Sequence, residues 1–304
     1  MSFPEFPMGK RMTGDATTVH PDRQLLEEVG SILGTAVLSA EYLTSGAANH
    51  IFRLTTAGGS LIMKNSKVDK PNLFPCEADA LRHIAQTKSV PVPNVLLSSA
   101  RYLILEDLGA EKTEIEDDNW RDLGTHIGQM HCVNNDRFGY YHNNYLGIWD
   151  QYNQFEDDWV TFFYENRVLC FLDVGSNRTL LTREDRRGIE AIISKIRSLV
   201  PPQRPSLCHG DLWKNNVYLS TDNVFYVLDP AIHFGLPEAD LATTQMYSVF
   251  PDSFYEGYRE SHELDGEWKR RLPLYQLKEL ILMIAQFEHA ESVQRLRSLI
   301  REYA

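Results

Sequence analysis

The stretch His209-Gly210-Asp211-Leu212-Trp213-Lys214-Asn215-Asn216, followed by Asp229, decides the expected fold of this chain. An apolar segment, 206–208, precedes it, and two more apolar segments, 217–219 and 225–228, follow it. Short apolar runs bounded by turn residues are typical of strands. The sequence therefore predicts a strand, then a polar loop, then a hairpin that ends at Asp229.

Three polar residues of this stretch, Asp211, Asn216 and Asp229, have a spacing with its own chemistry. In protein-kinase-type phosphotransferases the first Asp accepts the proton of the attacking hydroxyl, while an Asn five residues later and a second Asp hold Mg²⁺. Mg²⁺ prefers oxygen ligands, which carboxylates and amides supply. A lone His-Gly-Asp also occurs in ordinary turns, but the flanking strands favour the kinase interpretation. We therefore expect Asp211 to be catalytic, Asn216 and Asp229 to bind metal, and ATP and Mg²⁺ to be cofactors.

Lys64 ends the apolar segment 60–63, and Glu77 follows thirteen residues later at the start of a helical segment. A Lys at the end of a strand is often only reaching solvent. In kinases, however, a strand lysine contacts the α/β-phosphates and pairs with a helix glutamate. We expect this role for Lys64 and Glu77, although a Glu in a first helical turn also has an explanation in the helix dipole.

The rest of the nucleotide site has a weaker signal. The chain has no Gly-x-Gly-x-x-Gly, and the turn 45–50 is equally compatible with a phosphate-covering loop and with an ordinary hairpin turn. Glu106, Asp107 and Leu108 lie where the strand-rich part ends. We expect their backbone groups to contact the adenine edge of ATP.

Hydrophobic periodicity divides the chain into a strand-rich part and a helical part. Helices are expected from Asp22 and over 75–85, and strands over 40–44, 51–55, 60–63, 95–98 and 102–106. Beyond Leu108, apolar stripes at helical spacing predominate, including one or two helices over 268–303. This predicts an α+β, two-lobed, protein-kinase-like fold: a flexible leader (1–20), a small antiparallel β-rich nucleotide-binding lobe (21–107) and a larger, mostly helical catalytic and substrate lobe (108–304).

Composition limits the partners and the location. The 304 residues have a net charge of −12 and no Lys/Arg cluster of the kind that would follow a phosphate backbone, which makes nucleic acid and anionic membranes unexpected partners. Four dispersed cysteines are typical of reduced thiols. The first residues have no apolar signal segment, and no apolar run is long enough to span a bilayer. We expect a cytoplasmic protein, and the sequence gives no oligomeric state.

Other residues near the loop have two possible explanations. His209 is expected to orient the loop rather than to transfer protons, and Asp240 either serves a helix dipole or ties down the loop. No histidine spacing predicts a zinc site. Trp213 is expected to pack beside the substrate. Pro230-Ala231 follows Asp229 without an activation loop, so a protein kinase is not expected.

At the level of motifs, the chain resembles the fructosamine kinase family, relatives of the aminoglycoside phosphotransferases. The resemblance covers about residues 25–290 and rests on these segments: Leu207–Trp213 with Asn216, Leu228–Ala231, Gly235–Leu241, Asn144–Gly147 with Gln151 and Asn153, Asp158–Phe163, Phe254–Tyr258 and Leu274–Leu277. The resemblance implies ATP-dependent phosphorylation of a ketosamine, at the 3-hydroxyl of a fructosamine or ribulosamine adduct, free or protein-bound. The phosphate then eliminates and releases the amine, which is deglycation.

We expect Gln151 and Asn153 to position the sugar, because amides both donate to and accept from hydroxyl groups. Two alternatives stay open at this point. One is a kinase for another hydroxylated amine, such as an aminoglycoside, and the other is a catalytically silent kinase-like binding module. The complete set Lys64, Asp211, Asn216 and Asp229 argues against the silent module.

Overall fold

The computed structural model describes residues 19–246 and 249–304, so most of the predicted leader, 1–20, lies outside the described residues. The chain forms two compact units. The first comprises the described part of Met1–Ile115 with Tyr145–Trp149 and Val217–Pro230, and the second comprises Glu116–Asn144, Asp150–Asn216 and Ala231–Ala304. The units interleave along the chain, and the contiguous lobes 21–107 and 108–304 stay a prediction about functional domains.

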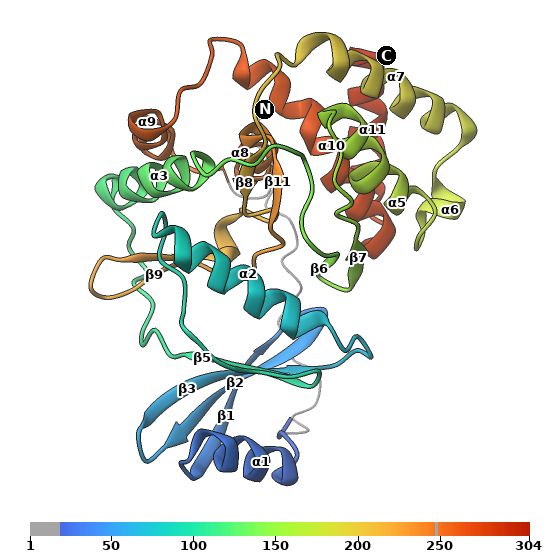
Figure 1. Cartoon of the computed structure of the whole chain (residues 1–304). Coiled ribbons are helices and arrows are strands. Elements are labelled where there is room, and N and C mark those ends of the chain that lie inside the picture. Colours follow the sequence, from blue (N-terminus) through green and yellow to red (C-terminus); the bar gives the residue numbers. More distant parts are fainter. Residues whose placement is uncertain (1–18, 247–248) are drawn as a thin grey trace. The chain divides into compact units, whose positions relative to one another are not determined.

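An antiparallel sheet forms the body of the first unit, in the strand order β1-β2-β3-β5-β4 (Figure 1). Its strands are β1 (Val37–Ser45), β2 (Asn49–Thr56), β3 (Gly59–Ser66), β4 (Val95–Ser98) and β5 (Tyr102–Glu106). All five were predicted from the sequence, and the first three are longer than the apolar segments that indicated them. Hairpin pairing extends β1, β2 and β3 into polar residues, because backbone hydrogen bonds do not depend on side-chain polarity.

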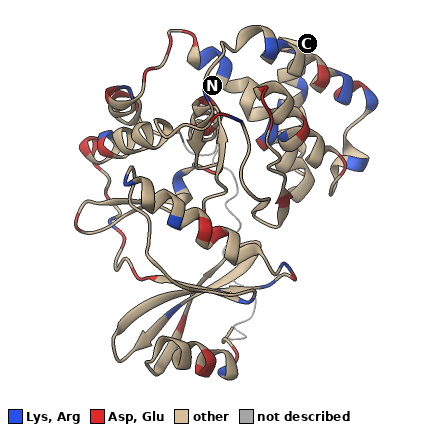
Figure 2. Ribbon diagram, viewed as in Figure 1, with Lys and Arg blue, Asp and Glu red and all other residues tan. Residues whose placement is uncertain are grey.

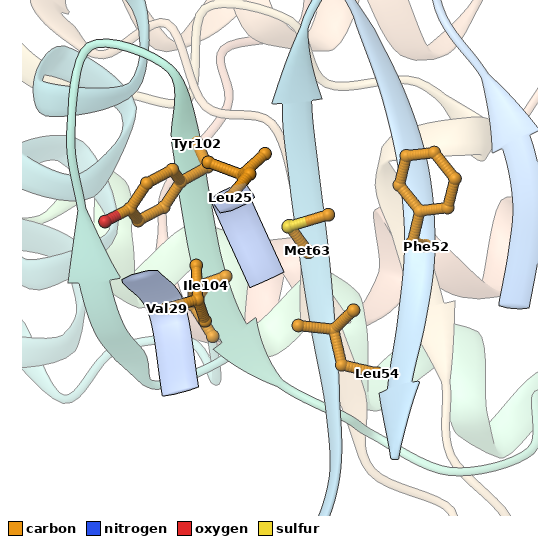
Figure 3. Packing of buried hydrophobic residues seen from close by; sticks show 7 residues of the cluster. All are labelled: Leu25, Val29, Phe52, Leu54, Met63, Tyr102 and Ile104. Carbon is orange, nitrogen blue, oxygen red and sulfur yellow. The ribbon is translucent and has the colours of Figure 1, made fainter. Parts of the chain in front are cut away.

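Helix α1 (Arg23–Leu33) covers one face of this sheet. It begins after Asp22, whose carboxylate accepts the Gln24 N–H at 3.0 Å, as expected for an N-cap. Figure 3 shows Leu25 and Val29 of α1 packed near side chains of β2, β3 and β5. These side chains are Phe52, Leu54, Met63, Tyr102 and Ile104. All seven side chains are buried and form the core of the unit.

Helix α2 (Leu73–Thr87) lies on the opposite face of the sheet (Figure 1). Successive side chains of a strand point to opposite faces. Met63 of β3 points into the α1 core, so Lys64, the next residue, points toward α2. This alternation is why an apolar strand can place one cation beside the helix.

A hairpin distant in sequence completes the first unit. Strands β9 (Val217–Leu219) and β10 (Phe225–Val227) pair antiparallel. The Val227 N–H donates to the Pro91 carbonyl at 3.0 Å, and the Lys112 N–H donates to the Leu219 carbonyl at 2.8 Å. These bonds attach the hairpin, and with it Asp229, to the unit that contains Lys64.

The second unit is mainly helical. Its elements are α3 (Asp117–His131), α4 (Trp159–Phe163), the π-helical η1 (Tyr164–Leu169), α5 (Cys170–Leu172), α6 (Asn177–Leu180), α7 (Arg183–Leu199), the 3₁₀ turn η2 (Lys214–Asn216), α8 (Pro237–Thr244), α9 (Asp252–Ser261), α10 (Trp268–Phe287) and α11 (Ala290–Tyr303). Strands β8 (Ser206–Cys208) and β11 (His233–Gly235) form a two-stranded sheet. Strands β6 (Asn144–Leu146) and β7 (Trp149–Gln151) form another. The antiparallel β-sheet and the helical C-terminal part confirm the predicted fold class.

Two glycines allow α3 and α9 to pack with their backbones in contact. A Cβ atom on Gly124 would lie 1.9 Å from the Phe254 carbonyl oxygen, and one on Gly257 would lie 1.9 Å from the Arg121 carbonyl oxygen. Only glycine fits at such distances. The sequence analysis did not anticipate this crossing, because neither glycine has a local signal.

Charged residues are mixed over the described residues. Figure 2 shows Lys and Arg alternating with Asp and Glu along helices such as α7, without a continuous basic stripe in the ribbon drawn in colour. Within the same part of the chain, no helix has the length and apolarity that a membrane span requires.

Candidate active site

Lys64 is the buried cation of the first unit. Its Nζ forms ion pairs with Glu77 of α2 and with Asp229, the residue that follows the β9–β10 hairpin. Lys64 is only 4% exposed. The predicted Lys64–Glu77 pair is therefore present, and the structure adds Asp229 as a second partner.

Burial and these carboxylates have opposite effects on the Lys64 ammonium group. Burial acts to lower the pKa of Lys64, but the charges of Asp229 and Glu77 outweigh it and raise the pKa above its usual value. Burial also raises the pKa of Glu77, against the effect of the Lys64 charge. Lys64 consequently keeps its positive charge, as a group that contacts phosphates must.

Asp229 is exposed, although it directly follows the apolar segment 225–228. Its side chain is 47% exposed, and its backbone is in the left-handed region, with φ at 54°. Asp tolerates this conformation better than most residues. The turn away from β10 explains the exposure, and it gives the carboxylate both a cationic neighbour and access to solvent.

The three residues after β5 have different surroundings. Glu106 Oε2 accepts from the Asn94 side chain at 2.7 Å, and the Glu106 N–H donates to the Asn94 carbonyl at 3.0 Å. Asp107 accepts from Arg53 Nε at 2.7 Å. Burial acts to raise the pKa of Asp107, but the hydrogen bonds from Arg53 and Gly109 hold it below its usual value. Among the described residues, the backbone groups of Leu108 have no hydrogen-bond partner.

The loop after β8 lies in the second unit and has a conformation that requires glycine. Gly210 has a φ of 84°, and a Cβ atom there would lie 2.2 Å from the Ala231 carbonyl oxygen. The Asp211 N–H donates to Nδ1 of the buried His209 at 3.3 Å. His209 therefore orients the loop through its ring, which fits the structural role expected from the sequence.

Asn216, at the end of η2, holds Asp211. Its Nδ2 donates to the Asp211 carbonyl and to Asp211 Oδ2, both at 2.8 Å. These bonds use the amide nitrogen of Asn216, and its amide oxygen remains for another ligand. An amide oxygen is a hard donor of the type that Mg²⁺ prefers.

Asp240 of α8 ties the loop to the helices. Its carboxylate accepts the N–H groups of His209 and Gly210, the latter at 2.8 Å, and lies 3.3 Å from Nε2 of His131. Asp240 is buried. Burial acts to raise its pKa, but the His131 hydrogen bond and nearby histidines outweigh it and lower the pKa to about 2. Of the two explanations for Asp240, the structure favours the one in which it ties down the loop.

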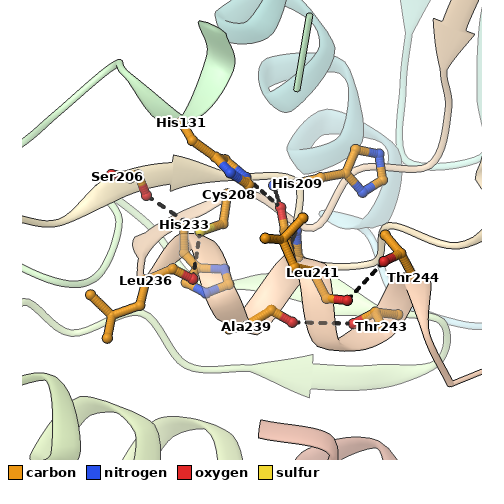
Figure 4. Close-up of polar contacts among 12 residues, drawn as sticks. His131, Ser206, Cys208, His209, His233, Leu236, Ala239, Leu241, Thr243 and Thr244 are labelled. Atoms are coloured by element: carbon orange, nitrogen blue, oxygen red, sulfur yellow. Dashed lines mark hydrogen bonds and ion pairs between the residues drawn. The ribbon is translucent and has the colours of Figure 1, made fainter. Parts of the chain in front are cut away.

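Figure 4 shows the side chains gathered around this anchor, among them His131, Cys208 and His209. His131, Cys208 and Asp240 bring possible metal ligands within 4.8 Å of one another, a set that no spacing in the sequence indicated. Their polar atoms already have protein partners: Cys208 contacts two backbone carbonyls, and His131 Nδ1 contacts the Tyr258 hydroxyl at 2.7 Å. We assign this cluster to the support of the loop.

Gln151 and Asn153 are not placed as the sequence suggested. Both are buried, at 0% and 1% exposure. Gln151 Nε2 donates to Asn144 Oδ1 at 2.9 Å and to the Ala231 carbonyl at 3.1 Å. Asn153 Nδ2 donates to Asn144 Oδ1 at 3.0 Å, and Asn153 Oδ1 accepts from Arg167 at 2.6 Å. Protein groups within one unit engage these amides, so this placement does not support direct contact with a sugar.

Three further residues, Trp213, Lys278 and Arg167, are partly or fully buried in the second unit. Trp213, expected beside the substrate, is half-buried. Lys278 of α10 is buried and donates to the Gly210 carbonyl at 3.1 Å, next to Asp211. Arg167 of η1 is almost fully buried. The sequence analysis missed Lys278 and Arg167, because a cation in a helix is ordinarily exposed.

The fold and the polar groups define a kinase-like phosphotransferase. The family model for fructosamine kinase matches residues 22–303. The chain belongs to the fructosamine kinase family. This confirms the family and the class of enzyme predicted from the sequence. Membership of a kinase family also implies that ATP is the phosphoryl donor.

Individual relatives agree with this family. A probable ketoamine kinase of Enterococcus faecium is 29% identical over 90% of this chain and 94% of its own. The probable ketoamine kinase YniA of Escherichia coli is 30% identical over 85% of this chain and 90% of its own. Among solved structures, a Thermobifida fusca protein that carries the name fructosamine-3-kinase has a TM-score of 0.83 at 29% identity, and the match covers 92% of this chain and all of that one.

Aminoglycoside phosphotransferase APH(4)-Ia has a TM-score of 0.64 at 16% identity, and the match covers 92% of this chain and 98% of that one. At this identity the likeness concerns the fold alone. It agrees with the predicted two-lobed, kinase-like architecture.

Proposed function

We propose that this protein is an ATP-dependent ketosamine kinase that phosphorylates a sugar hydroxyl, the 3-hydroxyl of a fructosamine or ribulosamine adduct. The observation that carries the proposal is the ion-paired Lys64, buried between Glu77 and Asp229 in a chain of this family. A surface lysine keeps its charge in water without ion-pair partners. A buried lysine that contacts phosphates must keep a fixed position and its positive charge, and two carboxylates provide both.

On the nucleotide side, we assign Lys64 to the α/β-phosphates, with Glu77 to orient it. The backbone groups of Leu108, which have no partner among the described residues, support contact with the adenine edge. Glu106 and Asp107 support that strand end through Asn94 and Arg53 rather than through groups left for a ligand.

We assign Mg²⁺ binding to Asp229 and to the amide oxygen of Asn216. Both are oxygen donors, and the Asp229 carboxylate is accessible to solvent. When bound, the metal neutralises charge on the phosphates. Asn216 also holds Asp211 through its Nδ2, so the same side chain connects the metal ligands with the base.

The proposed base is Asp211. Its carboxylate, which Asn216 holds through Oδ2, accepts the proton of the sugar hydroxyl in this proposal. The hydroxyl oxygen then bonds to the γ-phosphorus as the bond from that phosphorus to the bridging oxygen breaks, and ADP leaves. His209 and Asp240 keep the loop in place but touch neither reactant. We propose that Trp213 packs beside the substrate. Gln151 and Asn153 are assigned a structural role, since they hold Asn144, the Ala231 carbonyl and Arg167.

The test is turnover of ATP with Mg²⁺ and fructosyl-lysine or ribulosyl-lysine, followed by detection of the sugar 3-phosphate and the released amine. We expect phosphate on the ketosamine and none on an aminoglycoside. Phosphorylation of the aminoglycoside alone would reassign the substrate, and absence of turnover with either acceptor would leave a binding module. Protein-bound ketosamines are tested in the same way with glycated protein. The four cysteines form no disulfide among the described residues, which supports the proposed cytoplasmic location.

A further inference from the structure

A small cavity lies among buried residues of the second unit. Trp159 of α4, Arg167 of η1, and Tyr275 and Lys278 of α10 line it, together with Gly210. The space available to the centre of a water-sized molecule is about 10 Å³. That volume admits a single small occupant.

Three polar groups on this lining have no hydrogen-bond partner among the described residues: Trp159 Nε1, Arg167 Nε and the Tyr275 hydroxyl. Their residues are 5%, 1% and 2% exposed. A buried donor without a partner is costly. Trp159 lies near enough to the Tyr275 hydroxyl to affect its pKa. A small shift that let Trp159 donate to that oxygen would still leave the Tyr275 and Arg167 hydrogens without an acceptor.

Arg167 also lacks an ion-pair partner among the described residues. Its other nitrogens donate to the Tyr152 and Asn166 carbonyls and to Asn153 Oδ1, and its guanidinium lies 4.6 Å from the centre of the Phe162 ring. No carboxylate of the described residues forms an ion pair with it. Burial lowers the pKa of Arg167 to about 9, which reflects the cost of this isolated charge.

The other charged groups on the lining are balanced. Lys278 pairs with Glu279 at 2.6 Å and donates to the Gly210 carbonyl. Asp240 is the acidic group of the lining, and its oxygens already accept from His131, His209 and Gly210. Burial lowers the pKa of His233, another lining residue, well below its usual value, so this ring is neutral. The lining therefore holds one buried cation, Arg167, that forms no ion pair among the described residues, and donors that lack an acceptor.

We propose that this cavity binds one monatomic anion, chloride under ordinary conditions, through Arg167 Nε, the Tyr275 hydroxyl and Trp159 Nε1. A chloride ion accepts several hydrogen bonds and donates none. A water molecule would bring two donors of its own and no charge. The anion would also lie in the cavity that Lys278 lines. Since Lys278 holds the Gly210 carbonyl, occupancy would stabilise the loop that carries Asp211.

The first experiment measures thermal unfolding of the whole protein at a constant ionic strength of about 0.15 M, while chloride replaces gluconate. A ligand that binds only the folded state raises the unfolding midpoint with its concentration. We expect a rise of a few degrees for the wild type, on the order of 2–4 °C. We expect less than half of that response in Tyr275→Phe, which loses one donor and keeps the ring.

Tyr303→Phe is the matched control, because it removes a tyrosine hydroxyl that bonds the Arg270 carbonyl at an exposed site. It should keep the full chloride response. Equal midpoints of the wild type in chloride and gluconate would overturn the proposal, and so would an unchanged response in Tyr275→Phe. Neither result depends on kinase activity.

The second experiment is a crystal structure of the wild type grown in bromide. We expect an anomalous difference peak between Arg167 and Tyr275. A water molecule at that position without anomalous signal would refute the anion site and assign the three donors to solvent.

Discussion

Asp229 and Asp240 are eleven residues apart in the sequence and have opposite surroundings. The Asp229 side chain is 47% exposed, has an unusual backbone conformation and contacts one cation, Lys64. The Asp240 side chain is 3% exposed, and backbone N–H groups and a histidine surround its oxygens. A carboxylate with free oxygens can bind a ligand, whereas a carboxylate whose oxygens all accept protein donors holds the structure. The same residue type therefore supports the loop at position 240 and, at position 229, has the exposure that the proposed metal binding requires.

The largest loss of activity is expected for a change of Asp211, the proposed base, whose loop Asp240 holds in place. Asp211→Asn keeps the size of the side chain but cannot take up a proton. We expect kcat for the ketosamine to fall by about 10²–10⁴-fold, with ATP affinity and the unfolding midpoint nearly unchanged. Steady-state kinetics and nucleotide titration check this. Full activity of the variant would remove Asp211 from the mechanism.

Asp229→Ala tests whether Asp229 serves Mg²⁺ and nucleotide binding rather than the stability of the fold. We expect kcat to fall by about 10²–10³-fold and Mg²⁺-dependent nucleotide binding to weaken, because the change removes the proposed metal ligand and a partner of Lys64. The free energy of unfolding should change little, since the side chain is exposed. Asp222→Ala, at an exposed turn of the same hairpin, is the control and should retain activity. Normal ATP affinity and rate in Asp229→Ala would contradict the kinase assignment.

Asp240→Ala should show the reverse pattern, with stability as its main loss. The change leaves the His209 and Gly210 N–H groups buried without an acceptor. Each such donor costs about 1–3 kcal/mol, so we expect a loss of about 2–5 kcal/mol in the free energy of unfolding. Urea denaturation measures it. Asp157→Ala, at a side chain that is 86% exposed, should change stability far less. Equal stability of the two variants would show that Asp240 does not anchor the loop.

The free energy of unfolding should also depend on pH through Asp240. The pKa of Asp240 is about 2 in the folded protein, against an ordinary value of 3.8. A lowered carboxyl pKa stabilises the fold above the unfolded value, and the stabilisation is lost as pH falls from about 4 toward 2. The shift corresponds to about 2 kcal/mol. Urea denaturation at decreasing pH should show a steeper loss for the wild type than for Asp240→Asn. Asp185, also at about 2, titrates in both proteins and does not alter the difference.

The smallest effect on catalysis is expected at Gln151 and Asn153. In the structure both amides hold Asn144, the Ala231 carbonyl or Arg167. Replacing both with Ala should lower the free energy of unfolding, while the KM values for sugar and ATP change to a similar, small extent. A selective rise in the KM for the sugar would restore the direct contact first expected from the sequence.

Local pattern was sufficient for much of the fold. The strands around Lys64 and the helices at 268–303 follow from side-chain periodicity, which short stretches of chain express by themselves. The elements that local pattern missed, such as β11 and the π-helical η1, are short or irregular. Their formation depends on partners distant in sequence: β11 exists because it pairs with β8.

The family, the kinase-like class of fold and the polar residues Lys64, Asp211, Asn216 and Asp229 could be predicted from the sequence, because their spacing is local and their chemistry is specific. The surroundings of each residue follow from the folded chain. It placed Asp229 on Lys64, brought Asp240 to the loop amides and buried Gln151, Asn153 and Arg167. Burial, hydrogen-bond partners and pKa arise from contacts between distant segments, and one sequence read along its length does not contain those contacts explicitly.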